Sequence, residues 1–236
     1  MNDPKTPATY TVKVWDLPTR LFHWLLVIGI FAMWLTADVL DRLGLHMVIG
    51  YTLIGLIVFR VLWGIWGSDT ARFRHFIKGP GSITSYLRKP DTTVALGHNP
   101  LGALSVLALL LVIIIQLGTG LFASDQIYNQ GPLSDYASDK MVDLLTGIHE
   151  INFYVLLGLI GLHLAAIAFY QFKKHEPLVL AMITGKRVIK EGEVVQNAHL
   201  HFAGIIVFVI TAAIGIGAWY LISHQSKLLA GWLGLH

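Results

Sequence analysis

The chain has 236 residues, of which 55% are hydrophobic and 13% are charged, and its mean hydropathy is +0.63. This composition is typical of an integral membrane protein and leaves too little polar sequence for a separate soluble catalytic domain. Cysteine is absent, which excludes disulfides, thiolate metal sites and the covalent attachment of a c-type haem. The formal net charge is only +3, so we expect no nucleic-acid partner.

Five apolar stretches follow one another along the chain, each close to the roughly 20 residues that a helix needs to cross a bilayer. They cover 21–39, 45–66, 100–122, 144–172 and 202–223. The sequence therefore predicts an all-α integral membrane protein with five transmembrane helices and membrane lipid around them.

Basic residues are distributed unevenly over the segments between these stretches. All but three of the 17 lysines and arginines precede the first stretch, close the second, or lie in the second-to-third and fourth-to-fifth connections. By the positive-inside rule the N-terminus is cytoplasmic and, after five crossings, the C-terminus is periplasmic. The outer connections are acidic, which suits a basic soluble partner, although solvated loops explain the same charges. Their acidic residues are Asp38, Asp41, Asp125, Asp135, Asp139 and Asp143.

Two histidines lie within the fourth apolar stretch, where a polar side chain is costly. His149 and His163 are fourteen residues apart, a spacing that advances a helix by about 21 Å through nearly four whole turns. Both imidazoles therefore point the same way at two membrane depths. An ionisable or metal-binding side chain inside a membrane is usually functional. Two histidines on one helix face at two depths suit two haems stacked across the lipid.

Two further histidines match these depths once the topology is set. His46, near the outer end of the second stretch, pairs with the outer His149, and His23, near the inner end of the first stretch, pairs with the inner His163. A single histidine in an apolar helix is more often a packing residue than a ligand, but four at consistent depths favour two non-covalent bis-histidine haems. Six-coordinate iron suits electron transfer, because no coordination position stays open.

Haem propionates are anions and need cations at the membrane margin. Arg20 and Arg42 precede His23 and His46 by about one helical turn, and Arg60 follows His46 by fourteen residues on the same helix face. We expect these arginines to hold propionates. Snorkelling side chains that only mark the topology are the alternative.

His98 stands at the inner mouth of the third stretch. It could replace His23 as an axial ligand, bind a propionate or exchange protons with a quinone, and helix capping or solvent exposure would account for it equally well. Gln116, deep in the same stretch, could bond a cofactor or a neighbouring helix. Glycines near the ligands could leave room for a porphyrin or for close helix contact; they are Gly50, Gly55, Gly158 and Gly161.

Several longer segments carry further information in their order and spacing. They are VWDLPTRLFHWLL, ARFRHF with GPGSITSYL, GHNPLGAL, and HE followed by GLH in the fourth stretch. Over roughly residues 12–175 they resemble the bacterial cytochrome b561 and nickel–iron hydrogenase cytochrome b-subunit family. The resemblance implies a four-helix core in the bacterial inner membrane with two b-type haems that pass electrons between quinone and a redox partner. It also implies that His23, His46, His149 and His163 are the haem ligands.

On this basis the fold class is a four-helix haem-binding transmembrane bundle with a fifth, C-terminal transmembrane helix. Residues 1–175 are expected to form the di-haem core, 176–201 a cytoplasmic linker, and 202–236 the additional helix with a short outer tail. The linker and the fifth helix depart from the minimal four-helix members of the family, so the resemblance does not identify the partner.

The leading functional hypothesis is a respiratory-chain cytochrome b that transfers electrons between the quinone pool and an extracytoplasmic cytochrome c or dehydrogenase, in either direction. We expect quinone as a substrate near the inner haem, between His98 and the segment around Arg74 and His75. A superoxide:quinone oxidoreductase is an alternative that the acidic outer loops disfavour. A non-redox transporter is a second alternative, which would need polar midplane positions that are few here. A purely structural membrane anchor is a third.

Overall fold

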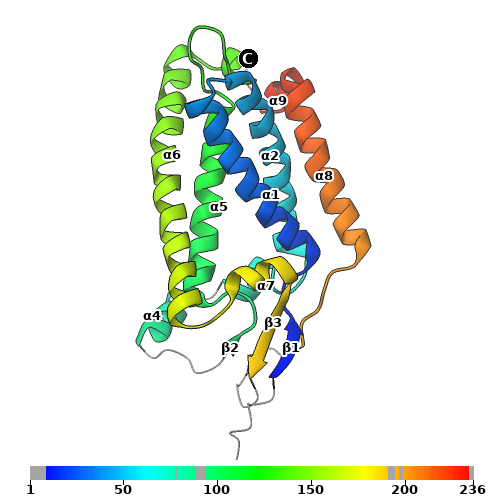
Figure 1. Cartoon of the computed structure of the whole chain (residues 1–236). Coiled ribbons are helices and arrows are strands. Elements are labelled where there is room, and N and C mark those ends of the chain that lie inside the picture. Colours follow the sequence, from blue (N-terminus) through cyan, green and yellow to red (C-terminus); the bar gives the residue numbers. More distant parts are fainter. Residues whose placement is uncertain (1–8, 78, 89–93, 191–194, 197–198, 234–236) are drawn as a thin grey trace, which may run out of the picture.

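The computed structural model describes residues 9–77, 79–88, 94–190, 195–196 and 199–233. It confirms the five predicted spanning helices, which are long and apolar enough to cross a membrane and stand side by side in Figure 1. They are α1 (Leu17–Trp34), α2 (Leu43–Trp66), α5 (Pro100–Gly120), α6 (Asp139–Ala168) and α8 (Ile205–His224). α1 and α6 each continue into a π-helical turn, at Leu35–Val39 and Phe169–Lys173.

Successive spanning helices run in opposite directions. α1, α5 and α8 rise from the end drawn at the bottom of Figure 1, and α2 and α6 return to it. We call the end with the α1–α2 and α5–α6 connections the upper end and the opposite one the lower end. The upper end also carries a 3₁₀ turn (Ser134–Tyr136) and the short helix α9 (Ser226–Trp232).

Short elements cover the lower end, and the apolar pattern of the chain gives no signal for them. The helices are α3 (Phe73–Phe76), α4 (Pro80–Arg88) and α7 (Leu178–Thr184). Strand β1 (Thr9–Lys13) pairs antiparallel with β3 (Lys186–Lys190), with Thr9 opposite Lys190, and β2 (Val94–Ala95) runs parallel to β4 (Val195–Gln196). The segment expected as a linker therefore contributes a helix and a strand that pairs with the N-terminal strand.

Two capping side chains define the lower ends of α1 and α5. The Asp16 carboxylate accepts a hydrogen bond from the Thr19 N–H at 2.8 Å, and the Asn99 side chain accepts one from the Gly102 N–H at 2.7 Å. Each cap satisfies an N–H group that has no partner inside the helix. The two helices therefore begin at residues that the sequence itself specifies.

The fifth helix packs directly against α2. At their crossing a Cβ atom added to Gly215 would lie 2.7 Å from the Gly55 carbonyl oxygen, and one added to Gly55 would lie 2.7 Å from the Gly215 oxygen. The two backbones thus touch, as small residues allow between membrane helices. Below the crossing the Phe208 ring of α8 packs edge-on against Phe59 and Trp63 of α2, with ring centres 6.0 and 6.2 Å apart. Gly55 therefore serves helix contact and leaves no room for a porphyrin.

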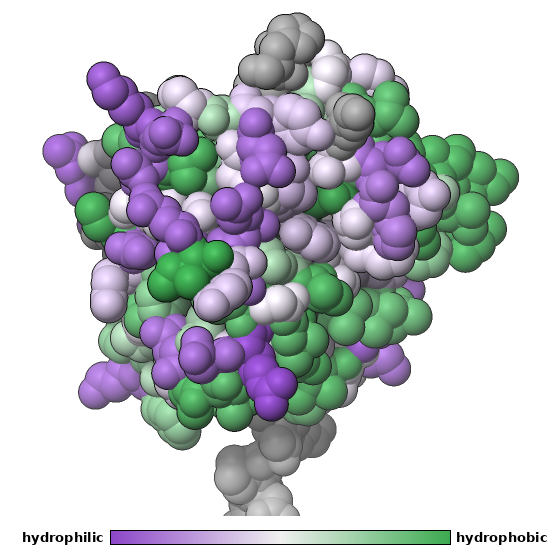
Figure 2. Space-filling view, turned by 90° about the horizontal axis from the view of Figure 1, so that it is seen from above, coloured by the Kyte–Doolittle hydropathy of each residue, from purple (hydrophilic) through white to green (hydrophobic). Residues whose placement is uncertain are grey.

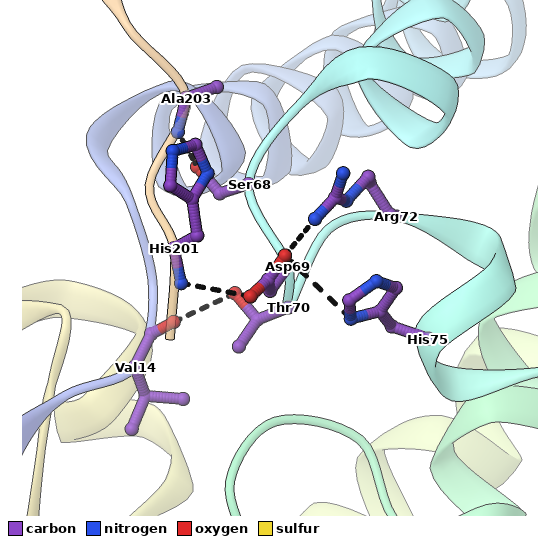
Figure 3. Close-up of polar contacts among 8 residues, drawn as sticks. All are labelled: Val14, Ser68, Asp69, Thr70, Arg72, His75, His201 and Ala203. Atoms are coloured by element: carbon purple, nitrogen blue, oxygen red, sulfur yellow. Dashed lines mark hydrogen bonds and ion pairs between the residues drawn. The ribbon is translucent and has the colours of Figure 1, made fainter. Parts of the chain in front are cut away.

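A polar cluster ties the start of α8 to the end of α2 (Figure 3). The Asp69 carboxylate accepts a hydrogen bond from the His201 N–H at 2.8 Å and pairs with Arg72, and the Ser68 hydroxyl accepts one from the Ala203 N–H at 3.0 Å. Although burial favours the neutral acid, these hydrogen bonds and the charges of Arg72 and His75 lower the pKa of Asp69. The carboxylate is therefore charged at neutral pH, which maintains this connection.

The outer surface of the bundle is apolar along the spanning helices. Large side chains such as Ile28 on α1, Ile151 on α6 and Ile205 on α8 are each more than half exposed, as expected of surfaces that face lipid. In the view from above, hydrophilic side chains spread over much of the upper end face and hydrophobic ones project at its edges (Figure 2). This distribution agrees with a multi-pass membrane protein.

We predict that Gly215→Ala destabilises the protein, because the new methyl group would meet the backbone of α2 at 2.7 Å. Overpacking of this kind costs about 1–3 kcal/mol. Gly217→Ala is the matched control, since no atom lies within 4 Å of a Cβ at that position of the same helix. Thermal unfolding in detergent should show a lower midpoint for Gly215→Ala only, and equal midpoints for the two variants would contradict the close crossing.

Candidate functional site

The structure brings His46 and His149 together near the upper end. His46 lies in the first turn of α2 and His149 lies ten residues into α6, so the antiparallel helices place them at one level. Their ring centres are 6.4 Å apart and their ring planes are inclined by 79°. The two histidines that the sequence predicted for this level therefore lie close together, with their ring planes nearly perpendicular.

Both imidazoles of the upper pair are held by main-chain carbonyl groups. His149 Nδ1 lies 2.9 Å from the Gln116 oxygen of α5, and His46 Nδ1 lies 3.0 Å from the Met33 oxygen of α1. A carbonyl oxygen only accepts, so each Nδ1 carries the proton and donates it. The other ring nitrogen, Nε2, is then left with a free lone pair, which is the state of a metal-binding imidazole.

The separation of these rings fits one metal ion between them. Two imidazoles on opposite sides of an ion have ring centres about 6.3 Å apart, because each metal–nitrogen bond is about 2 Å and each nitrogen lies about 1.1 Å from its ring centre. The observed 6.4 Å agrees with this value. The upper pair therefore has the protonation and the ring separation that two axial histidines of a haem iron would need.

A glycine makes space for the His149 ring. A Cβ atom on Gly120 would lie 2.9 Å from His149 Cε1, closer than side chains normally approach. Gly50, one turn after His46, has only the end of the Met33 side chain nearby, at 3.5 Å. These two glycines lie beside the upper pair, whereas Gly158 and Gly161 have open space around them.

One polar residue of this level, Asn152, was not predicted from the sequence. Its side-chain amide donates to the Gln116 Oε1 at 2.7 Å and to the Val112 carbonyl at 3.0 Å, which joins α6 to α5 one turn below His149. Gln116 therefore bonds a neighbouring helix, one of its two predicted roles. The signal that could have found Asn152 is its polarity in an apolar helix, three residues after His149.

The lower level gathers three histidines. His163 of α6 lies within electrostatic range of His23 of α1 and of His98 at the mouth of α5. His23 Nδ1 is shielded from solvent and has no hydrogen-bond partner among the described residues, and the same holds for His98 Nδ1. The lower histidines are thus near one another, but carbonyl groups do not hold them as they hold the upper pair.

His98 is enclosed by aromatic rings. Its ring centre lies 4.8 Å from that of Trp15 and 4.6 Å from that of Phe76 in α3. Burial, with the nearby charges of Arg60 and His163, lowers the pKa of His98 to about 3. His98 is therefore neutral at pH 7, and its role in proton exchange with a quinone stays a prediction. Helix capping is excluded, because Asn99 caps α5.

Arg60 is a buried cation in the lower half of α2. Its side chain is only 3% exposed, lies over the rings of Phe73 at 5.0 Å and Phe22 at 5.8 Å, and donates a hydrogen bond to the Ala71 carbonyl at 3.3 Å. A guanidinium group has five N–H donors, so this one retains donors for a further acceptor. An anionic group such as a propionate would complete the site.

The other two predicted arginines are placed differently. Arg20 donates to the main-chain carbonyls of Asp16 and of Ile183, the latter near the end of α7, so it joins α1 to α7. Arg42 is exposed at the upper end, where it precedes the first turn of α2.

The segment predicted to border the quinone is placed only partly as expected. Arg74 and His75 are exposed, and His75 Nδ1 lies 3.7 Å from the Asp69 carboxylate. The residue of this segment that contacts His98 is Phe76.

The structure was also searched for groups of metal-binding side chains and for cavities. Within the described residues no group of three or more histidine or acidic side chains is arranged to hold a metal ion. A haem iron needs only two protein ligands, because the porphyrin supplies the other four nitrogens. Between α2 and α5 lies an apolar cavity of about 350 Å³, with Ile54, Val58 and Ile114 among its lining residues.

Comparison with known proteins agrees with this geometry. The family model described as prokaryotic cytochrome b561 matches residues 14–185, which is most of the chain. The chain belongs to the prokaryotic cytochrome b561 family. Membership makes it a multi-pass prokaryotic membrane protein and a b-type cytochrome of electron transport, with haem b as its cofactor.

A curated relative supports the same assignment at lower similarity. The probable Ni/Fe-hydrogenase B-type cytochrome subunit of Rhizobium leguminosarum bv. viciae is 20% identical in an alignment 223 positions long. The alignment covers 78% of this chain and 91% of the relative. No solved structure matches the chain significantly. The family is thus established by sequence, while the arrangement of the site comes from the structure described above.

We predict that Gly120→Ala displaces the His149 ring, because the new Cβ would lie 2.9 Å from Cε1. The purified variant should retain less haem than the wild type, and its ferric low-spin signal should be broadened or shifted. Gly118→Ala on the same helix is the control, since no atom lies within 4 Å of a Cβ there. Identical haem content and spectra for the two variants would show that Gly120 is not needed beside His149.

Proposed function

We propose that the protein binds two b-type haems, one at each level, and transfers electrons between a membrane quinone and a redox protein outside the bilayer. The observation that carries the proposal is the upper pair, whose 6.4 Å ring separation and carbonyl-held Nδ1 atoms suit axial ligation by His46 and His149. A bound haem supplies reversible one-electron chemistry. The chain supplies the ligands, their spacing and an apolar surrounding.

His23 and His163 are the proposed ligands of the lower haem. Their support is the shared depth, their electrostatic proximity, and the shielded His23 Nδ1 without a partner among the described residues. His98 is the less suitable alternative, because Trp15 and Phe76 pack against its ring. Arg60 is the proposed partner of a propionate at this level, where its remaining donors need an acceptor. For Arg20 and Arg42 the same role lacks comparable support.

Proton-coupled chemistry of a quinone is proposed at the lower end. His98 is neutral, so it can donate a hydrogen bond to a quinone carbonyl without carrying a charge. Phe76 from α3 covers His98, and the exposed Arg74 and His75 of the same helix border water.

A soluble redox partner is proposed at the upper end, where the α5–α6 connection is firmly organised. The Asp125 carboxylate accepts three N–H hydrogen bonds at 2.9 Å from residues 127–129, and Ser124 is bonded to Thr146 of α6. The resulting loop presents Tyr128, which is 91% exposed. A rigid loop with an exposed aromatic side chain among aspartates suits a partner with a basic surface. The same acidic charge disfavours a superoxide substrate.

The proposed orientation places the lower end in the cytoplasm and the upper end in the periplasm of a bacterial inner membrane. It rests on the basic residues of the lower connections and the aspartates of the upper ones. Within this arrangement residues 1–175 are the proposed di-haem core and 202–236 the additional unit. The contact between Gly55 and Gly215 joins the two, so the additional helix is attached to a ligand-bearing helix of the core.

We predict two haems b per chain, both low-spin, and all extractable into acidified organic solvent because the chain has no cysteine. His46→Leu and His149→Leu should each lose one haem, and His23→Leu and His163→Leu should each lose the other. The pyridine haemochrome assay gives the ratio of haem to protein, and redox titration identifies which haem remains. A ratio near one in the wild type, or loss of the same haem by His46→Leu and His163→Leu, would contradict the pairing.

We predict that His98→Ala slows reduction of the haems by quinol while both haems stay bound, because the variant removes the proposed hydrogen bond to the quinone carbonyl. The decrease should be about tenfold, the typical size of one lost hydrogen bond at a site of this kind. His224→Ala at the upper end of α8 is the control. Unchanged rates over a range of quinol concentrations would exclude His98, and a quinone bound at the upper end would exclude the lower site.

A further inference from the structure

The upper level contains a hydrogen-bond arrangement that dictates the state of His149. Thr119 Oγ1 lies 2.7 Å from the Ile115 carbonyl oxygen and 3.1 Å from the Gln116 carbonyl oxygen, and its single proton goes to these main-chain acceptors, so towards His149 Nδ1, at 3.3 Å, it presents only lone pairs. The Gln116 carbonyl at 2.9 Å is also an acceptor. Both neighbours of Nδ1 are thus acceptors, and the Nδ1–H tautomer is the one that satisfies them.

A second contact holds the residue that provides this carbonyl. The Asn152 amide donates to the Gln116 side-chain oxygen at 2.7 Å and to the Val112 carbonyl at 3.0 Å. Asn152 is only 8% exposed and lies on α6, the same helix as His149. The histidine and the asparagine of α6 therefore bind the main chain and the side chain of one residue on α5, which fixes the distance between Gln116 and His149.

We propose that Gln116, Thr119 and Asn152 are positioning residues for His149, which fix its tautomer and ring plane and lower the midpoint potential of the haem at the upper level. The proposal rests on the proposed function, because it presumes a haem between His46 and His149. These residues act through His149 and do not touch the iron.

The effect on the potential follows from ligand chemistry. A hydrogen bond from Nδ1–H to a carbonyl increases the electron donation of the imidazole and thereby favours the ferric state. His46 has the same support from the Met33 carbonyl at 3.0 Å. At the lower level His23 Nδ1 has no such partner among the described residues, so the lower haem serves as an internal reference that these substitutions should leave unchanged.

The test uses the full-length protein with both haems bound. Asn152→Leu and Gln116→Leu each remove one side of the amide contact with little change in volume, and the double variant completes a mutant cycle. Thr119→Val removes the second acceptor, and Thr211→Val is its matched control, because Thr211 is a buried threonine of α8 that donates to its own helix. The readouts are the midpoint potential of each haem and the ferric low-spin resonance, which reports the angle between the two imidazole planes.

We expect each single variant to raise the potential of the upper haem only. The ratio of ferric to ferrous haem at a fixed potential should change by about tenfold, which is about 59 mV for a one-electron couple. The double variant should shift no further than the larger single one, because both substitutions remove the same contact. The resonance of the upper haem should also move, and Thr211→Val should leave both haems as in the wild type.

Three results would overturn the proposal. They are an unchanged upper haem in Asn152→Leu and Thr119→Val, equal shifts of both haems, and additive shifts in the double variant. Selective loss of the upper haem in a variant would support a positioning role for the substituted residue. Loss of both haems in Asn152→Leu would show that this contact is purely structural. Thr119→Val then decides whether the acceptors near His149 Nδ1 set the potential of the upper haem. A wild-type protein with fewer than two haems would instead refute the proposed function, so the two failures are distinguishable.

Discussion

The constraint on which the structure depends is that hydrocarbon offers no hydrogen-bond partner, so a polar group within the bilayer must be satisfied by the protein itself. For His46 and His149 the partners are main-chain carbonyls of the neighbouring helices α1 and α5. Each bond satisfies the N–H group and, by the same geometry, leaves the opposite ring nitrogen free. The hydrogen bond that satisfies each polar group therefore also leaves Nε2 in the state that the proposed metal ligation needs.

α2 is the helix through which the other parts are connected. It carries His46 near its upper end and the buried Arg60 in its lower half, and it contacts α8 at Gly55. The Asp69 cluster of Figure 3 then joins the end of α2 to the residues that precede α8. Because α8 is attached at its crossing and at its lower end, it limits the tilt and shift of a helix that bears a proposed ligand. This gives the fifth helix a physical role inside the protein itself.

The sequence was sufficient for features that depend on periodicity and length. The five helices and the joining of His46 with His149 follow from apolar runs, alternating direction and the fourteen-residue spacing. Features that depend on contacts between distant residues were not predictable in this way. Gly55 meets a glycine 160 positions away, Arg20 bonds the carbonyl of Ile183, and His98 is neutral because aromatic rings from two other segments enclose it. The β1–β3 ribbon likewise requires strands too short to show a pattern.

The two levels of the bundle differ in how their polar groups are satisfied, and the difference bears on their roles. At the upper level the Nδ1–H groups of His46 and His149 already donate to main-chain carbonyls, so they need no acceptor from a ligand. At the lower level the buried Nδ1 atoms of His23 and His98 have no partner among the described residues, and Arg60 retains donors. Unsatisfied buried groups are costly unless a ligand completes them. A carboxylate or carbonyl oxygen supplied from outside the chain would do so, and both haem propionates and quinones carry such oxygens. The lower end is therefore the one at which buried donors of the protein need an oxygen acceptor from a bound ligand.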